Sequence, residues 1–520
     1  MRDNMKHFGS IGALVLLACA PGFPQAPPGA AASSSGGGTS ATILPASGRT
    51  NQSGSVAITE QPVAGTNTSV NTLNPNIAIS GPYSGSARST AAMPFTGRLS
   101  LEDALKRGLA FNLGSVGSAQ AARQYNAQVR AARSALLPNI NGSLSENVQQ
   151  TDLAAFGLHF SVPGFHFATV VGPYNYFTLQ GNLSQTVADL TAIDNYRSAK
   201  ATARASRYSL DDARDLVTLA VGGAYLQVLA AQARVDSAQA QLDTANAVFR
   251  QSSEQHQQGV LGRLNVDQSQ LQTLAQQQQI ITLRNDLAKQ KINLARTVGL
   301  PPNADYQLTD SFPFTPAPFD SVNDAVAQAE LQRSDLKAAE SQVEAARKAL
   351  SAARAERLPS ASLSGYYETI GTTPSQAHGA FSVVGTVNIP IWQGGKTESD
   401  IAQAEAVLAQ RQAELDDTRS QIEAEVRQAY LDLEAAAGQV EVARKSLQVA
   451  QETLEMARAR MQAGVINTVE VVQAQQTVSG AQLDLINSIF AHNLAKLTLA
   501  RDLGHASEQL PRILKAELQQ

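Results

Sequence analysis

The sequence predicts a mainly α-helical protein with a smaller transmembrane β part, in which one structural unit occurs twice along the chain. Three observations support this fold class: an internal duplication, long segments with a seven-residue apolar repeat, and two segments in which apolar and other residues alternate. We therefore expect each copy to contain a helix, a β-hairpin and a long coiled-coil hairpin.

The duplication is visible by direct alignment of the chain with itself. Moved by 205 positions, residues 189–300 align without a gap with the second copy, and Gly259 matches Gly464. Further upstream the offset becomes 221 positions, and Pro138 matches Pro359. The difference, 221 minus 205 or 16 residues, is extra chain in the first copy. A constant offset on both sides of one variable segment indicates rigid elements that flank a loop.

The two copies divide the chain. The first structural repeat is predicted at residues 98–310 and the second at residues 320–505, with a C-terminal tail at residues 506–520. A period near 200 residues is too long for a solenoid repeat, so each copy is one large supersecondary unit.

Heptad spacing predicts very long helices. In the second copy, larger apolar residues recur every seven positions and alanines follow three residues later. The larger residues are Val426, Leu433, Val440, Leu447, Leu454 and Met461, and the alanines are Ala429, Ala436, Ala443, Ala450 and Ala457. The first copy repeats the pattern at Val221, Val228, Val235, Leu242 and Phe249 beside Ala224, Ala231, Ala238, Ala245 and Ser252.

The helix after Gly395 runs without proline to about Ala463, which is roughly 70 residues or on the order of 100 Å. Gly259 and Gly464 then mark the coiled-coil turns, because glycine commonly ends a helix. Shorter helices, from Leu101 to about Leu136 and from Val322 to about Leu358, open the two copies and end before prolines.

Each proline is followed by alternating residues. They predict a strand hairpin at about residues 139–187 and another at about residues 360–392. The strands are near the length that a tilted strand needs to cross a bilayer, but four strands cannot close a barrel. Unpaired strand edges are excluded from lipid, so the simplest closure is a trimer with 12 strands, four from each protomer. A soluble hairpin packed on the helices is the alternative.

The N-terminus carries export features. Residues 1–19 resemble a signal peptide, because Arg2 and Lys6 precede a short apolar run. The single cysteine, Cys19, ends a lipobox-like LLAC sequence and is a candidate for lipid attachment; an ordinary signal peptide is the alternative. Residues 20–95 are rich in Ser, Gly, Pro and Ala, which predicts a disordered tether.

Composition excludes several classes of function. The formal charge is −4 and the pI is about 6.0, so nothing favours nucleic acid as a partner. No phosphate-binding loop, nucleophile elbow or zinc spacing occurs, and we expect no enzyme activity, no cofactor and no metal site. His159 and His166 in the long first loop are interpreted as plain loop residues.

In the order of its elements, the chain resembles the TolC-like outer membrane efflux protein family, also called outer membrane factors. The resemblance extends from about residue 98 to residue 505. It rests on Ala132, Arg133, Leu136, Leu137 and Pro138; their copies Ala353, Arg354, Leu358 and Pro359; the junction Pro390, Ile391, Trp392, Gln393, Gly394 and Gly395; and Gly464 followed by Val469, Glu470, Val471 and Val472.

The resemblance implies a homotrimeric, porin-like duct of an efflux or secretion system. A β-barrel would lie in outer membrane lipid, and an α-helical barrel would project into the periplasm with polar faces, Gln276 to Gln279 among them, lining a bore. A periplasmic adaptor protein and an inner-membrane pump, of the resistance-nodulation-division, ABC or a similar type, would complete the system. A periplasmic coiled-coil adaptor or scaffold that does not enter the membrane is the alternative.

The same resemblance implies the site residues. The adaptor-docking tip would consist of the two helix turns, at Gly259, Val260, Leu261, Gly464, Val465 and Ile466. A pore-mouth gate would include Glu470, with Gln473 one turn later and Asn265 at the matching position of the first copy. Glu470 near a helix start is equally compatible with a surface charge favoured by the helix dipole. Family members that carry a lipid also support Cys19 as an attachment site.

Overall fold

The computed structural model describes residues 55–63, 72–87, 95–157, 168–311, 314–315, 321–463, 468–504 and 506. Every described element belongs to the unit Ala41–Gln520. The predictions for the signal peptide, Cys19, His159 and His166, and for the C-terminal tail beyond Ala506, fall on residues that are not described.

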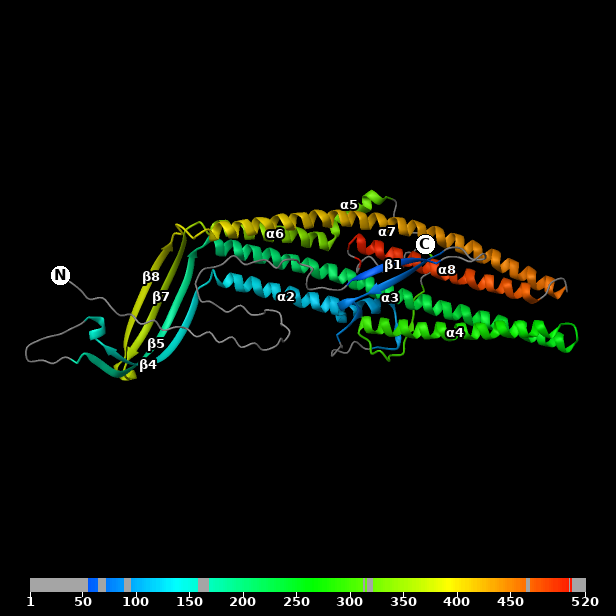
Figure 1. The fold of residues 1–520 in the computed structure, drawn as a ribbon, viewed down its shortest axis with the longest axis horizontal. Helices are drawn as coiled ribbons and strands as arrows, with labels where there is room; N and C mark the ends of the chain where they lie inside the picture. The colour runs from blue at the N-terminus through cyan, green and yellow to red at the C-terminus, as the bar shows by residue number, and fades with distance from the viewer. Residues whose placement is uncertain are drawn as a thin grey trace, which may run out of the picture. The chain divides into compact units, whose positions relative to one another are not determined.

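The duplication is confirmed element by element (Figure 1). The first copy consists of α1 (Leu101–Phe111), α2 (Leu113–Ser134), β4 (Asn139–Asp152), β5 (Val170–Ala188), α3 (Leu190–Gln257) and α4 (Arg263–Val298). The second copy consists of α5 (Val322–Gln332), α6 (Ser334–Ala355), β7 (Ser360–Gly371), β8 (His378–Asn388), α7 (Lys396–Gln462) and α8 (Thr468–Asp502).

The opening helix of each copy is broken, which corrects the prediction of single helices. Asn112 (φ −61°, ψ 134°) separates α1 from α2, and Arg333 (φ −61°, ψ 129°) separates α5 from α6 at the equivalent position. Both residues have extended backbone. The Asn112 side chain accepts a hydrogen bond from the Gly114 amide, so the break is capped locally and costs little.

The predicted strands form one antiparallel sheet in the order β4-β5-β7-β8. The pairing of β5 with β7 joins the two repeats, and it begins at Phe177 opposite Gly371. The first hairpin therefore extends beyond the second, as its extra residues require. Large apolar side chains of the sheet, such as Ile140 and Phe381, are exposed in the isolated chain. β4 and β8 are the edges of this sheet.

The heptad seams are confirmed as buried stripes. Val426, Val440, Val221 and Val228 are buried, and the alanine ladders beside them are also mostly buried. Among the glutamines expected to line the bore, Gln276 is instead buried, so that prediction is wrong at this residue.

One described helix, α3, is long and apolar enough by composition to cross a membrane. Most of its apolar window, 72%, is buried inside the fold, as expected of a core helix.

Part of the predicted tether is ordered. β1 (Val56–Val63) pairs with β2 (Thr72–Ile79), and a short 3-10 helix, Gly81–Ser84, follows. Ile77 occupies the space beside Gly223 of α3, and Tyr83 is buried. These few apolar residues anchor a segment whose composition is otherwise that of a disordered chain. Nearby, β3 (Arg98–Leu99) and β6 (Gln307–Leu308) form a short parallel pair.

Candidate functional site

The α3–α4 turn is the half of the predicted tip that the structure describes. Gly259 has a left-handed backbone (φ 77°), and its amide donates to the His256 carbonyl at 2.9 Å. The Val260 amide donates to the Gln255 carbonyl at 2.9 Å. These two bonds define a Schellman motif, which satisfies the last carbonyls of α3. The predicted helix turn at Gly259 is confirmed.

The turn is hydrogen-bonded within itself and presents apolar surface. His256 Nδ1 donates to the Leu261 carbonyl at 2.7 Å and ties the end of α3 to the loop. Val260 is 73% exposed at the tip of the turn, and nothing lies near the Cβ position of Gly259. A preformed loop with an exposed aliphatic residue suits contact with another protein. Its role in docking stays a prediction.

The second turn is described only at its flanks. Gly464, Val465 and Ile466 lie outside the described residues. Glu470 is in the first turn of α8, and both Glu470 and Gln473 are exposed, while Asn265 is half-buried in α4. A hydrogen bond of 3.2 Å from Gln476 to Gln272 holds α8 beside α4. The gate assignment therefore stays a prediction.

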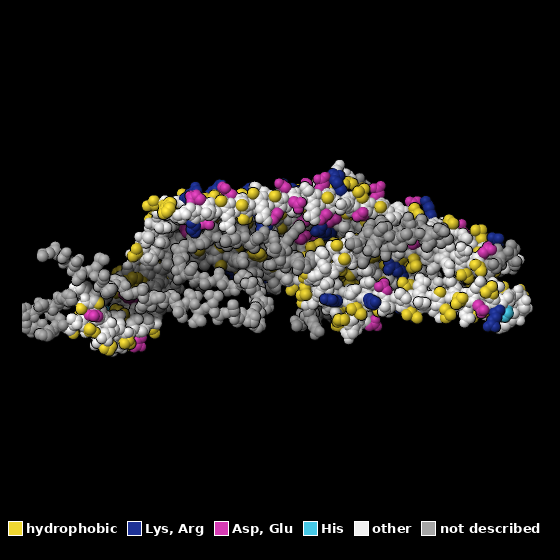
Figure 2. Space-filling view, viewed as in Figure 1, with side chains coloured by type: hydrophobic (Ala, Val, Ile, Leu, Met, Phe, Trp, Pro, Cys, Tyr) yellow, Lys and Arg dark blue, Asp and Glu magenta, His cyan; other side chains and the backbone are white. Residues whose placement is uncertain are grey.

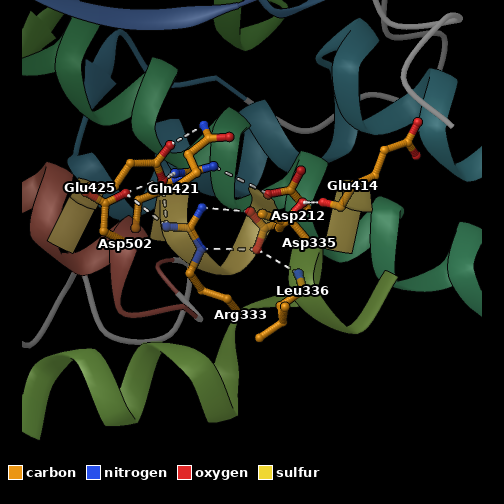
Figure 3. A network of polar contacts seen from close by, with 10 residues as sticks. Asp212, Arg333, Asp335, Leu336, Glu414, Gln421, Glu425 and Asp502 are labelled. Carbon is orange, nitrogen blue, oxygen red and sulfur yellow. Dashed lines mark hydrogen bonds and ion pairs between the residues drawn. The ribbon is translucent and has the colours of Figure 1, made fainter. Parts of the chain in front are cut away.

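Sequence reasoning missed a buried ion cluster where α5 gives way to α6 (Figure 3). The Arg333 side chain is only 4% exposed, and its guanidinium donates to Asp335 at 2.7 Å and to Glu425 at 2.6 Å. Arg501 donates to Glu425 at 3.0 Å and to Asp502 at 2.9 Å. The cluster joins α6, α7 and the end of α8.

A fourth helix, α3, contributes negative charge to the cluster. Asp212 of α3 lies 3.7 Å from Arg501, and Asp215 is close enough to influence it. Burial raises the pKa of Asp212 to about 6; Arg501 opposes this and Asp335 adds to it. Burial alone would raise the pKa values of Asp335 and Glu425, but the positive charge of Arg333 outweighs it and holds both pKa values below their ordinary range. The carboxylates of the cluster outnumber its two arginines, so the net charge of the cluster depends on how many carboxylates carry a proton.

The equivalent place in the first copy lacks the carboxylates of the cluster and the counterpart of Arg333. Asn112 replaces Arg333, and its amide donates to the carbonyls of Tyr83 at 2.7 Å and Thr297 at 3.2 Å. Tyr83 occupies the space that a side chain at Gly114 would need. Contacts with Tyr83 of the N-terminal segment thus fill this place in the first copy, whereas ion pairs fill the equivalent place in the second copy. The sequence carries no local signal for the cluster, because its pairs Arg333–Glu425 and Arg501–Glu425 join residues far apart in the chain.

Within the described residues, no group of three or more His, Cys, Asp or Glu side chains is placed to hold a metal ion. The geometry consists of helix turns, buried seams and an exposed sheet, which are parts of a duct.

Comparison with protein-family models matches residues 116–300 and 325–505 to the outer membrane efflux protein family, which is well over half of the chain and both repeats. The chain belongs to this family. It is therefore an outer membrane efflux channel protein, whose helical part projects into the periplasm. No match is found among curated protein sequences.

Solved structures show the same fold. The CmeC outer membrane channel of Campylobacter jejuni is 19% identical, with a TM-score of 0.68, 85% of this chain covered and 98% of that chain. For VceC of Vibrio cholerae the values are 18%, 0.65, 78% and 96%. For the open state of MtrE of Neisseria gonorrhoeae they are 17%, 0.64, 80% and 95%. This efflux protein thus has the duplicated architecture predicted from its sequence.

Proposed function

We propose that this efflux protein is a homotrimeric, passive duct from the periplasm to the exterior, energised by a partner pump in the inner membrane and joined to it by a periplasmic adaptor. The observation that carries the proposal is the four-stranded sheet with two open edges, β4 and β8. A sheet edge in lipid leaves backbone groups without partners, and closure with other copies satisfies them. Three copies supply 12 strands, within the known range of barrels.

The surface of the sheet supports its place in lipid. Ile140, Leu144, Phe381 and Val383 are large apolar residues with mostly exposed side chains. In water such a surface would promote aggregation, whereas in a bilayer it is solvated by acyl chains. The duct needs no catalysis and no cofactor. A periplasmic scaffold would have no use for this surface.

For the tip, we assign adaptor docking to the two helix turns. The exposed Val260 and the fixed backbone at Gly259 support this role. A three-fold ring of Glu470 would attract cations at the inner mouth, with Gln473 and Asn265 as its neutral neighbours. Cys19 would anchor the N-terminus to lipid.

Single-channel conductance in planar bilayers tests the duct, with the mass of the detergent-extracted protein measured in parallel. We expect a trimer and discrete conductance steps. A soluble monomer without conductance would return the protein to the class of periplasmic scaffolds.

The same bilayers test the gate. Glu470→Gln removes the charge at nearly constant volume, so we expect weaker block by divalent cations on the periplasmic side. Gln473→Glu, which adds a second ring, should strengthen the block and serves as the opposite control. Unchanged block in both variants would remove Glu470 from the pore mouth.

A further inference from the structure

The two faces of the four-stranded sheet differ in chemistry. In an antiparallel sheet, residues directly opposite each other lie on the same face, and successive residues of one strand lie on opposite faces. The strand register therefore assigns each paired residue to a face. One face carries most of the large exposed apolar side chains of the sheet: Ile140, Leu144, Val148, Leu179, Tyr367, Phe381, Val383 and Val387. This apolar face suits lipid in the proposed barrel.

The opposite face is rich in hydroxyl and amide groups. Along the paired strands it consists mostly of Ser, Thr, Asn and Gln, together with Tyr174, Tyr176 and Tyr366. Lipid-facing and lumen-facing residues alternate along each strand of a transmembrane barrel. This second face, which we call the lumen face, therefore lines the duct.

The sheet contains no lysine or arginine on either face. Both residue types are missing from the sequence throughout 134–188 and 358–395, which include the loops between paired strands. Arg133 precedes the first of these stretches, and Arg357 and Lys396 flank the second. In Figure 2 the part of the sheet in view has hydrophobic and acidic side chains, but none of the dark blue of Lys and Arg. The barrel segment thus has no basic residue to offset its acidic ones.

The acidic residues of the strands, Glu146, Asp152 and Glu368, lie in three different settings. Asp152 is at the tip of the first hairpin, and its side chain accepts a hydrogen bond of 2.9 Å from a backbone amide of the following turn. Glu146 is on the apolar face, where its carboxylate accepts from Asn175 at 3.5 Å. Of the three, only Glu368 lies on the lumen face.

The surroundings of Glu368 leave its charge uncompensated. In the register, Glu368 is opposite Gln180 of β5 and Ala380 of β8. The Gln180 amide donates instead to Asn182 at 2.9 Å. Glu368 is half-buried, and within the part of the chain that the structure describes no hydrogen bond or ion pair reaches its carboxylate. A charge on the wall of a narrow aqueous passage changes the local concentration of ions of both signs.

We propose that Glu368 makes the outer part of the duct selective for cations, so that cationic and neutral cargo passes the barrel more readily than anionic cargo. The inference rests on the homotrimeric duct proposed above, in which three copies place three Glu368 carboxylates around one lumen. At about 10 Å in water, three negative charges enrich monovalent cations and deplete anions a few-fold in dilute salt. The hydroxyl and amide groups of the lumen face hydrogen-bond polar cargo without adding charge.

This site is separate from Glu470, which the proposed function places at the inner mouth. Glu470 is in the first turn of α8, and the 67 residues of α7 separate that turn from the sheet in the chain. Every variant below retains Glu470, so a change in ion selectivity reports on the sheet.

Reversal potentials of single channels in a KCl gradient measure the ratio of K⁺ to Cl⁻ permeability. We expect the wild-type channel to favour K⁺. Glu368→Gln, which removes the charge at nearly constant volume, should lower the ratio about three-fold or more in dilute salt. The matched control is Glu146→Gln, the same substitution on the apolar face, which should leave the ratio unchanged. Recordings at pH 8 avoid a contribution from protonated imidazole, because His378 also lies on the lumen face.

Two further variants keep the test independent of one substitution. Glu368→Ser introduces a residue type that is frequent on this face and should lower the ratio as Glu368→Gln does. Glu368→Asp retains the charge and should retain the wild-type ratio. The trimer mass in detergent and the unitary conductance are measured for every variant, which separates a loss of selectivity from a loss of assembly.

A lower ratio in the two neutral Glu368 variants, with Glu368→Asp and Glu146→Gln like the wild-type channel, supports the proposal. A wild-type ratio near 1, or a ratio that the neutral variants do not change, overturns the role of Glu368 and leaves the duct intact. An equal change in Glu146→Gln overturns the assignment of the two faces. A soluble wild-type monomer without conductance overturns the proposed function itself.

Discussion

Asp212 lies where two arginines and several carboxylates share one partly buried space. Burial raises its pKa from 3.8 to about 6, and Asp335 and Asp215 add to this while Arg501 and Arg333 oppose it. The folded chain therefore binds this proton more tightly than the unfolded chain. The resulting stabilisation is complete below pH 3.8 and is lost as the pH rises through about 6.

Asp212→Asn should consequently stabilise the fold at pH 7.5 and have little effect at pH 3.5, below the ordinary pKa of 3.8. We expect a gain of about 1 to 2 kcal/mol at the higher pH, less than the full shift implies, because 28% of the side chain is exposed and screened. Thermal unfolding at the two pH values measures it. Asp211→Asn, at an exposed residue paired with Arg214, is the control. An equal gain at both pH values would contradict the proton linkage.

At the scale of single elements, the α3–α4 turn offers a matched pair of glycines. Gly259 has φ 77°, whereas Gly262, the N-cap of α4, has φ −72°. Gly259→Ala should destabilise the turn by about 1 kcal/mol, since a side chain disfavours left-handed backbone, and Gly262→Ala should not. Hydrogen exchange of the Val260 amide measures the difference. Equal exchange in both variants would mean that the Schellman motif does not fix this loop.

The long elements were predictable because each has a local signal. Heptads from Val426 to Leu454 gave α7, and alternation around Tyr366 gave β7. The breaks at Asn112 and Arg333 were not predicted, because helical segments continue on both sides without a proline and tertiary contacts decide the backbone at these two residues. The pairing of β1 with β2 was also not predicted, because contacts with distant parts of the chain decide the structure of that segment.

The ion cluster was beyond sequence reasoning for a different reason. Arg333 and Glu425 are 92 residues apart in the chain, and Arg501 and Glu425 are 76 apart. Neither pair has the i,i+4 spacing that reveals ion pairs on one helix. For the candidate site, the turn at Gly259 was correctly placed, whereas Gly464 to Ile466 lie outside the described residues.

For the whole molecule, the duplication makes two leucines a test of assembly. Leu226 is buried within the chain, and its counterpart Leu431 is exposed in the isolated chain, where we expect a second copy to cover it. Leu226→Gln should therefore lower the stability of the chain itself by about 2 to 5 kcal/mol. Leu431→Gln should leave the isolated chain nearly unchanged and weaken each contact between copies by about 2 kcal/mol.

Mass measurement of the two variants across a dilution series in detergent, beside thermal unfolding, separates these effects. We expect Leu431→Gln to dissociate at a higher protein concentration than the wild-type chain and then to unfold at the temperature of the wild-type monomer. A trimer has three equivalent contacts between copies, and its dissociation to monomers breaks all three. A modest change at one residue should therefore shift the monomer–trimer equilibrium by far more than a single contact implies. If Leu431→Gln assembles like the wild-type chain, this helix face points away from the neighbouring copy.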